Sequence, residues 1–327
     1  MKAWQVHELG RPVDVLRLDD IPTPVPGPGQ LGVRVLAAAA NFPDVLMISG
    51  GYQVRPPLPF TPGIELCGEV LAVGEGVTRS AIGDRVIGSW AMPHGGFAEH
   101  ALMIDELSYP APAALDDAEA ASFHVGHQTA WFGLYRRAGL KPGETLLVHA
   151  AAGGVGHAAV QLGKATGARV IAVVGGPEKV DVARSLGADV VIDRTTTDIV
   201  AAVKEATGGR GADVVFDPVG GASYTASTKC IAFEGRLVVV GFTSGEIPAP
   251  ALGHALVKNY SIVGLHWGLY ATHDPESIRR AHDDLTALVD KGAIRPLVSE
   301  RLALDDVPDG LQRLADGTTT GRVTFVA

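Results

Sequence analysis

The chain has 327 residues, of which 46% are hydrophobic and 19% charged, and its formal net charge at pH 7 is −9. This length predicts two domains, and the negative balance without a long basic run argues against nucleic acid as a partner. Two cysteines, Cys67 and Cys230, are too few for a disulfide framework or a cysteine-rich zinc site. No signal-peptide pattern opens the chain, and no apolar run approaches the ~20 residues of a membrane helix, so we expect a cytoplasmic protein.

The first 120 residues have the pattern of a β-rich domain. Ten of the 21 prolines fall before residue 63, a density that excludes long helices. A short helix is expected at residues 44–49 and a longer one from Asp116 toward Arg137, where Glu119 completes a capping box. Aliphatic runs between glycine-rich turns predict strands at 32–37, 66–73 and 85–88.

From residue 145 to about 264, strand and helix patterns alternate. Continuous aliphatic strands with helical crossovers indicate a parallel sheet that is covered on both faces. The expected strands are 145–149, 169–174, 190–193, 213–217, 236–240 and 261–264. The expected helices are 155–166, 177–186, 198–207 and 224–230.

The segment from residue 265 onward holds too few elements for a third domain. A helix begins at Asp274-Pro275-Glu276, with proline in its first turn, and a short helix at 308–316 and a strand at 322–326 follow. We expect this segment to return to the first domain. The predicted organisation is therefore 1–120, 121–264 and a return segment, 265–327, that completes the first domain.

A turn of small residues separates the first strand and the first helix of the alternating region. It reads A-x-G-x-x-G at Ala151, Gly153 and Gly156. Such a turn needs no side chains, so a pyrophosphate can approach the backbone and bind the N–H groups at the helix N-terminus. A simple packing turn would have the same composition, but the strand before it and the helix after it favour a dinucleotide site and redox chemistry.

The choice of dinucleotide depends on the end of the second strand, where NAD sites usually carry Asp or Glu. Here the strand ends at Val174-Gly175-Gly176, without an acid. Lys179 and Arg194 suit a 2′-phosphate, although Lys179 is also typical of an exposed helix. Glu178 argues the other way but is expected on a solvated helix face. We therefore predict NADP(H).

Further motifs stand in order along the chain: Asn41-Phe42-Pro43-Asp44, Gly51-Tyr52, Pro62-Gly63-Ile64-Glu65, Gly83-Asp84-Arg85-Val86, and Gln161 after the glycine-rich turn. With that turn, the chain resembles the medium-chain dehydrogenase/reductase superfamily, and within it the zinc-independent NADPH:quinone oxidoreductases (zeta-crystallin-like). The resemblance implies an α/β fold class, with a GroES-like, partly open β-barrel domain and a Rossmann doubly wound parallel sheet. It also implies an active site in the cleft between the domains and a homodimer or tetramer joined around residues 260–264.

The resemblance also concerns metal binding. Zinc alcohol dehydrogenases of this fold have Cys before the first active-site helix and a Gly-His-Glu later in the chain. Here Ala40 or Asn41 stands at the first place and Gly63-Ile64-Glu65 at the second. Isoleucine cannot ligate a metal, and tetrahedral zinc needs three or four converging ligands, so we expect no metal. Glu65 is then expected to be structural.

Residue by residue, the resemblance assigns the catalytic positions to Asn41, Asp44 and Tyr52. Asn41 would bond the ribose or the substrate oxygen. Tyr52 would donate a proton or a hydrogen bond to the developing oxyanion, the alternative being an aromatic that only lines the pocket. The expected cofactor-binding residues are Asn41, Thr129, Ala152, Gly153, Gly154, Val155, Gly175, Gly176, Lys179, Arg194, Val219, Phe242, Ser244, Leu265 and Trp267.

Without a Lewis acid, the hydride acceptor must already be electrophilic, as a quinone or a conjugated enone is. We therefore predict an NADPH-dependent quinone reductase that acts on a small molecule. Two alternatives stay open. One is an enoyl or alkenal reductase, acting on an enone, a 2-alkenal or an enoyl thioester; the other is a non-catalytic, crystallin-like NADPH-binding protein.

Overall fold

The computed structural model describes residues 1–326, which divide into two compact units. Unit 1 comprises Met1–Val125, Ile278–His282 and the segment from Arg295 onward. Unit 2 comprises Gly126–Ser277 and Asp283–Ile294. Both units are discontinuous in sequence, and the segment expected to return to the first domain is shared between them. Within the described residues, no helix is both long enough and apolar enough to cross a membrane.

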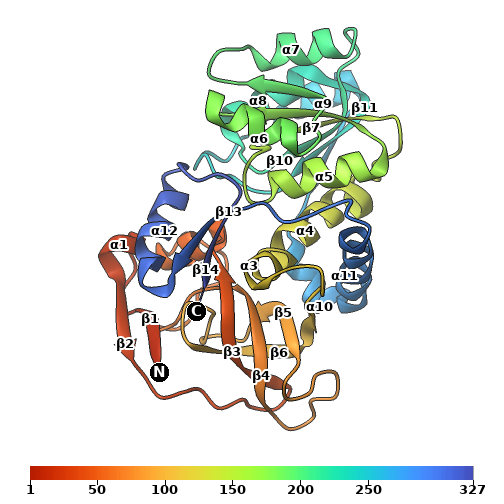
Figure 1. The fold of residues 1–327 in the computed structure, drawn as a ribbon. Coiled ribbons are helices and arrows are strands. Elements are labelled where there is room, and N and C mark those ends of the chain that lie inside the picture. The colour runs from red at the N-terminus through yellow and green to blue at the C-terminus, as the bar shows by residue number, and fades with distance from the viewer. Residues whose placement is uncertain (327) are drawn as a thin grey trace. The chain divides into compact units, whose positions relative to one another are not determined.

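Unit 1 is built around a six-stranded sheet in the order β13-β14-β3-β4-β5-β6 (Figure 1). β6 also pairs with β3, so β3 to β6 close into a small barrel. The strand bounds are β3 Gln30–Ala39, β4 Glu65–Val73, β5 Arg85–Trp90, β6 His100–Pro110, β13 Val298–Ala303 and β14 Arg322–Val326. β14 pairs antiparallel with β3, which attaches the late segment of the chain directly to the barrel.

Several short elements complete unit 1. β1 (Lys2–Val6) and β2 (Leu16–Asp20) form a separate antiparallel pair. The helices are α1 (Pro12–Val15), α2 (Phe42–Ile48), α3 (Asp117–Ala121) and α12 (Val307–Ala315). α12 buries Val307 and Leu311, which lie one turn apart on one face, and this face joins the same apolar core as Phe325 of β14.

Unit 2 is a parallel sheet with helices packed against it. Its strand order, β12-β11-β10-β7-β8-β9, is the 3-2-1-4-5-6 order of a dinucleotide-binding sheet read from the other edge. The strands are β7 Thr145–Val148, β8 Arg169–Val174, β9 Val190–Asp193, β10 Ala212–Asp217, β11 Ile231–Val239 and β12 Ser261–Gly264. The helices against this sheet are α5 Gly156–Thr166, α6 Val180–Ser185, α7 Ile199–Ala206 and α8 Gly221–Cys230. The barrel and the doubly wound sheet together confirm the expected fold class.

The helices depart from the sequence expectations in three places. The helix expected from Asp116 has its capping box, but it breaks into α3, α4 (His124–Trp131) and a π-helix, Phe132–Arg137. A 3-10 turn, Pro177–Lys179, precedes α6. The sequence patterns did not indicate α9 (Leu252–Lys258). The late elements include two 3-10 turns, Trp267–Leu269 and Leu304–Asp306, together with α10 Tyr270–His273 and α11 Pro275–Asp290.

Candidate active site

In unit 2, the turn between β7 and α5 is built for close approach to the backbone. Ala150 adopts a left-handed φ of 48°, and the Gly153 N–H donates to its carbonyl at 2.9 Å. A methyl group on Gly156 would overlap the Ala150 carbonyl oxygen, and one on Gly153 would lie 3.1 Å from it. The His157 N–H donates to the Gly153 carbonyl, whereas the N–H groups of Ala152, Gly154 and Val155 bond no other described residue. Residues 152–155 therefore form a cradle that fits a pyrophosphate.

Charged side chains gather at the ends of the neighbouring strands β8 and β9. A methyl group on Gly175 would lie 2.8 Å from Nη2 of Arg194, so the guanidinium lies directly over the end of β8. Asp193 accepts hydrogen bonds from the Gly176 N–H at 3.1 Å and from the Thr195 N–H and hydroxyl. These amide and hydroxyl donors lower the pKa of Asp193. The Arg194 position suits a 2′-phosphate.

The turns after β10 and β11 pack on each other at the same edge of the sheet. Asp217, buried at the end of β10, accepts from the N–H groups of Val219 and Gly220 at 2.9 and 3.0 Å. The Phe242 ring lies against Gly220, and the Ser244 hydroxyl donates to the Val219 carbonyl at 2.8 Å. Val219, Phe242 and Ser244, expected from the sequence to bind the cofactor, are thus brought together.

The remaining expected cofactor residues of unit 2 differ in how available they are. Thr129 is 8% exposed on α4. The Trp267 indole N–H donates at 3.3 Å to Oε1 of Gln128, which directly precedes Thr129 in the chain. Leu265 is a core residue, because its N–H donates to Val239 and its side chain packs near the π-helix at Gly133. Only the Leu265 backbone carbonyl is therefore left for a ligand.

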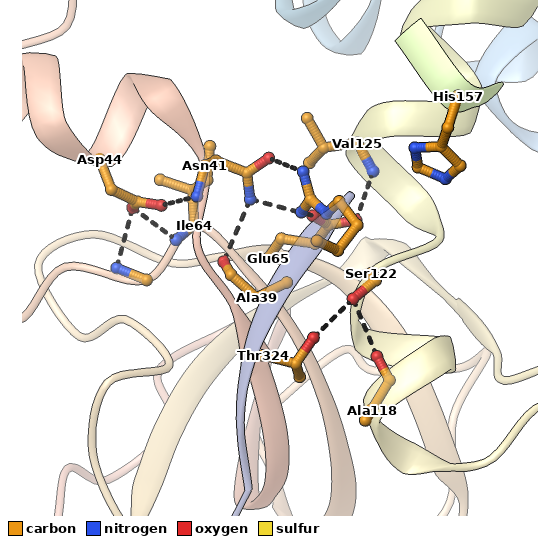
Figure 2. Close-up of polar contacts among 12 residues, drawn as sticks. Ala39, Asn41, Asp44, Ile64, Glu65, Ala118, Ser122, Val125, His157 and Thr324 are labelled. Atoms are coloured by element: carbon orange, nitrogen blue, oxygen red, sulfur yellow. Dashed lines mark hydrogen bonds and ion pairs between the residues drawn. The ribbon is translucent and has the colours of Figure 1, made fainter. Parts of the chain in front are cut away.

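In unit 1, Asn41 lies in a buried network that links two distant strands (Figure 2). Its Nδ2 donates to Oε2 of Glu65 at 2.9 Å and to the Ala39 carbonyl at 3.2 Å. Its Oδ1 accepts from Nη1 of Arg322 at 3.0 Å. A guanidinium only donates, so the Asn41 amide oxygen must face Arg322. Both amide N–H groups are therefore committed, and only acceptor capacity on Oδ1 is left.

Arg322 completes this network, and the sequence patterns did not single it out. It stands at the start of β14, is 3% exposed, and forms an ion pair with Glu65, which is fully buried. The other Glu65 oxygen accepts from the Val125 N–H at 2.7 Å. Burial raises the pKa of Glu65 above its ordinary value, and the Arg322 charge opposes that rise. The only signal in the sequence was that Arg322 is a single basic residue at the start of a predicted strand.

Asp44 is a fully buried carboxylate that holds backbone at two places (Figure 2). One oxygen accepts from the Asn41 N–H, which forms the capping box of α2. The other accepts from the N–H groups of Gly63 and Ile64, each at 3.0 Å. Burial raises the pKa of Asp44 to about 7, against the opposing effect of these donors and of Arg322. Both oxygens are committed to the backbone.

Tyr52 is the remaining expected catalytic residue. It is partly buried against the unit 1 core, and within residues 1–326 its hydroxyl forms no hydrogen bond. Burial, and secondarily the charge of Asp44, raise its phenolic pKa. The hydroxyl therefore keeps its proton at neutral pH and is available to donate it.

These positions do not fit a zinc ion. Ile64 offers no donor atom, the Asn41 amide is committed, and both Glu65 oxygens are occupied by Arg322, Asn41 and Val125. Within residues 1–326, no group of three or more His, Cys, Asp or Glu side chains is arranged to hold a metal.

Comparison with known protein families matches both halves of the chain. Residues 27–113 match the alcohol dehydrogenase GroES-like domain, and residues 154–286 match a family described as zinc-binding dehydrogenase. The chain is 39% identical over 326 residues to a quinone oxidoreductase-like protein 2 homolog of Nematostella vectensis, covering 99% of this chain and 88% of that protein.

Two further relatives widen this picture. The structure of Escherichia coli quinone oxidoreductase complexed with NADPH superimposes with a TM-score of 0.92 at 31% identity, and both chains are covered completely. The chain is also 32% identical to phthioceranic/hydroxyphthioceranic acid synthase of Mycobacterium tuberculosis over 92% of its own length, but over only 14% of that protein.

Proposed function

The chain belongs to the zinc-independent quinone oxidoreductases of the medium-chain dehydrogenase/reductase superfamily, and from this premise we propose that it reduces quinones with NADPH. Bound NADPH would supply a hydride. The cradle at residues 152–155 would hold its pyrophosphate, Arg194 with Lys179 its 2′-phosphate, and the turns at Val219 and Phe242 the nicotinamide half.

The observation that carries this proposal is the hydrogen-bonding state of Asn41 and Tyr52. Because both Asn41 N–H groups are committed, this side chain is left to accept a hydrogen bond, and a ribose hydroxyl of the cofactor is a suitable donor. Tyr52 has the free hydroxyl of this pair. We assign to it the hydrogen bond, and then the proton, for the oxyanion that forms as a quinone accepts hydride.

Asp44 then acts as a positioning residue rather than as an acid or base. Its oxygens fix the backbone of Asn41 and of the Gly63-Ile64 turn, and neither is left to meet a substrate. The quinone needs no metal, since its reduced oxygens share the incoming charge across the ring.

The substrate class is tested by supplying NADPH with benzoquinone, phenanthrenequinone, a cyclic enone or crotonyl-CoA and following NADPH oxidation. We expect turnover with the quinones. Turnover with the enone or the thioester alone would replace this assignment by the second candidate, an enoyl reductase, which the similarity to the phthioceranic/hydroxyphthioceranic acid synthase favours. Tight NADPH binding with no acceptor reduced would instead favour a non-catalytic role.

We further propose that the protein is a homodimer joined through unit 2. β12 is an edge strand, so its outer backbone groups have no strand neighbour among the described residues. The loop before α9 and α9 itself present an apolar face, which we call the α9 face, made of Ile247, Leu252, Leu256 and Val257, exposed by 72–83%. A second copy related by a two-fold axis would pair β12 with itself and cover this face.

A further inference from the structure

Glu178 places a negative side chain at the end of β8, beside the positive side chains that are expected to bind the 2′-phosphate. A methyl group on Gly176 would lie 2.5 and 2.6 Å from the two oxygens of Glu178, so this carboxylate folds back over the strand end. Glu178 is exposed, as the sequence pattern indicated, but its carboxylate lies beside the backbone of Gly176.

Side chains of opposite charge therefore lie over two adjacent glycines. The Arg194 guanidinium lies over Gly175 and the Glu178 carboxylate over Gly176, and no ion pair joins the two within the described residues. Asp193, which bonds the Gly176 N–H, adds a second negative charge at the same edge. The strand ends thus offer both an anion-binding group and a hydroxyl-binding group.

We propose that Glu178 is a specificity-determining residue that opposes the 2′-phosphate of NADP(H) and accepts a ribose hydroxyl of NAD(H), so that the protein uses both cofactors. This inference rests on the proposed function. A carboxylate accepts hydrogen bonds from the 2′-hydroxyl of NADH, and it repels a phosphate at the same carbon. Arg194 works in the opposite sense, because its guanidinium gains a charge-assisted bond only when the phosphate is present.

The size of the effect follows from Coulomb's law. A phosphate of about two negative charges some 6 Å from a carboxylate in a solvent-exposed site loses on the order of tenfold in affinity. Neutralising Glu178 should therefore shift the ratio of the NADH to the NADPH dissociation constant by ~10-fold toward NADPH.

The test measures the dissociation constants of NADPH and NADH by titration calorimetry for four proteins: wild type, Glu178→Gln, Arg194→Met and Asp181→Asn. Asp181→Asn is the matched control, since it removes the same charge one turn further on, where the side chain is 88% exposed. We expect Glu178→Gln to tighten NADPH ~10-fold without tightening NADH, Arg194→Met to weaken NADPH alone, and Asp181→Asn to change neither.

Two results would overturn the inference separately. If the NADH-to-NADPH ratio of Glu178→Gln equals that of Asp181→Asn while the wild type binds NADPH, Glu178 has no selective role and the proposed function stands. If the wild type binds neither cofactor, the proposed function fails and the inference fails with it.

Discussion

Arg322 and Glu65 form a buried ion pair, so removing one charge leaves the other unpaired in the interior of unit 1. We expect Arg322→Met to lower the free energy of unfolding by about 3–5 kcal/mol, measured by urea denaturation. The double variant Glu65→Gln with Arg322→Met should recover part of this loss, because no buried charge is then left alone.

The matched control is Arg301→Met. Arg301 forms an ion pair with Asp116, but both side chains are about half exposed, so the loss should be less than about 1 kcal/mol. If both arginine variants lost the same free energy of unfolding, the buried ion pair would be no more costly to break than the exposed one.

Tyr52 gives a prediction about catalysis. Tyr52→Phe removes the only atom that we assign as the proton donor, and kcat should fall by about 10²-fold while the NADPH dissociation constant is unchanged. Because the phenolic pKa is raised, the wild-type kcat should not fall through ionisation of Tyr52 at neutral or mildly alkaline pH. In the control variant Tyr135→Phe, the lost hydroxyl donates to the Leu162 carbonyl and accepts from the Thr166 hydroxyl, away from the expected site, so kcat should be unchanged. An unchanged kcat in Tyr52→Phe would leave this ring a packing role.

Asp44 predicts a pH dependence of stability. Its pKa is about 7 in the folded protein and 3.8 ordinarily, so between these values the folded state binds more protons than the unfolded state. The contribution of Asp44 is therefore fully present below about pH 4 and is lost as the pH rises through about 7. Urea denaturation across this range should show a flatter pH profile for Asp44→Asn than for wild type. Parallel profiles would show that Asp44 does not titrate there.

Sequence reasoning predicted some of the site residues and missed others. The family resemblance assigned Asn41, Asp44 and Tyr52 to the site, and the structure puts the first two in one hydrogen-bonded cluster. Sequence reasoning did not identify Arg322, because the bond to Asn41 joins residues 281 positions apart and depends on the pairing of β14 with β3. Nor did it place the Glu178 carboxylate, which depends on a side-chain rotamer.

At the scale of elements, the turn before α5 makes the sharpest prediction. Gly156→Ala would drive a methyl group into the Ala150 carbonyl, so the cradle must shift. We expect a loss of about 1–3 kcal/mol in stability and a weaker affinity for NADPH. Gly253→Ala in α9 is the control: nothing lies within 4 Å of the added methyl group, and helix propensity should raise stability by about 0.5–1 kcal/mol. Unchanged NADPH binding by Gly156→Ala would contradict a tight cradle.

The elements of unit 2 were largely predictable because each strand is a short aliphatic run between glycine-rich turns. β8, β9 and β12 have the expected bounds, and the first residue of α5 differs by one. α9 was not predictable, since its apolar residues Leu252, Leu256 and Val257 are exposed and do not mark a buried face. The break in the helix after Ala121 likewise depends on the packing of unit 1, where Glu65 binds the Val125 N–H.

At the scale of the whole molecule, the α9 face predicts the oligomeric state. Wild type should sediment as a dimer. Leu256→Glu should sediment as a monomer, because it would bury a charge in the dimer interface. Leu9→Glu changes an exposed leucine of unit 1 and should leave the dimer intact. A monomeric wild type, or a dimeric Leu256→Glu variant, would exclude this interface.

The bond between Arg322 and Asn41 also orders events during synthesis on the ribosome. At about 5–20 residues per second, the 281 residues that separate the two take on the order of tens of seconds to translate. From its own synthesis until Arg322 is made, Glu65 has no ion-pair partner from β14. The strands of unit 2 are translated inside this interval, so the parallel sheet can form before the barrel is complete. A nascent chain stalled before Arg322 should therefore protect β7 to β12 from proteolysis while β3 and β4 are still cleaved.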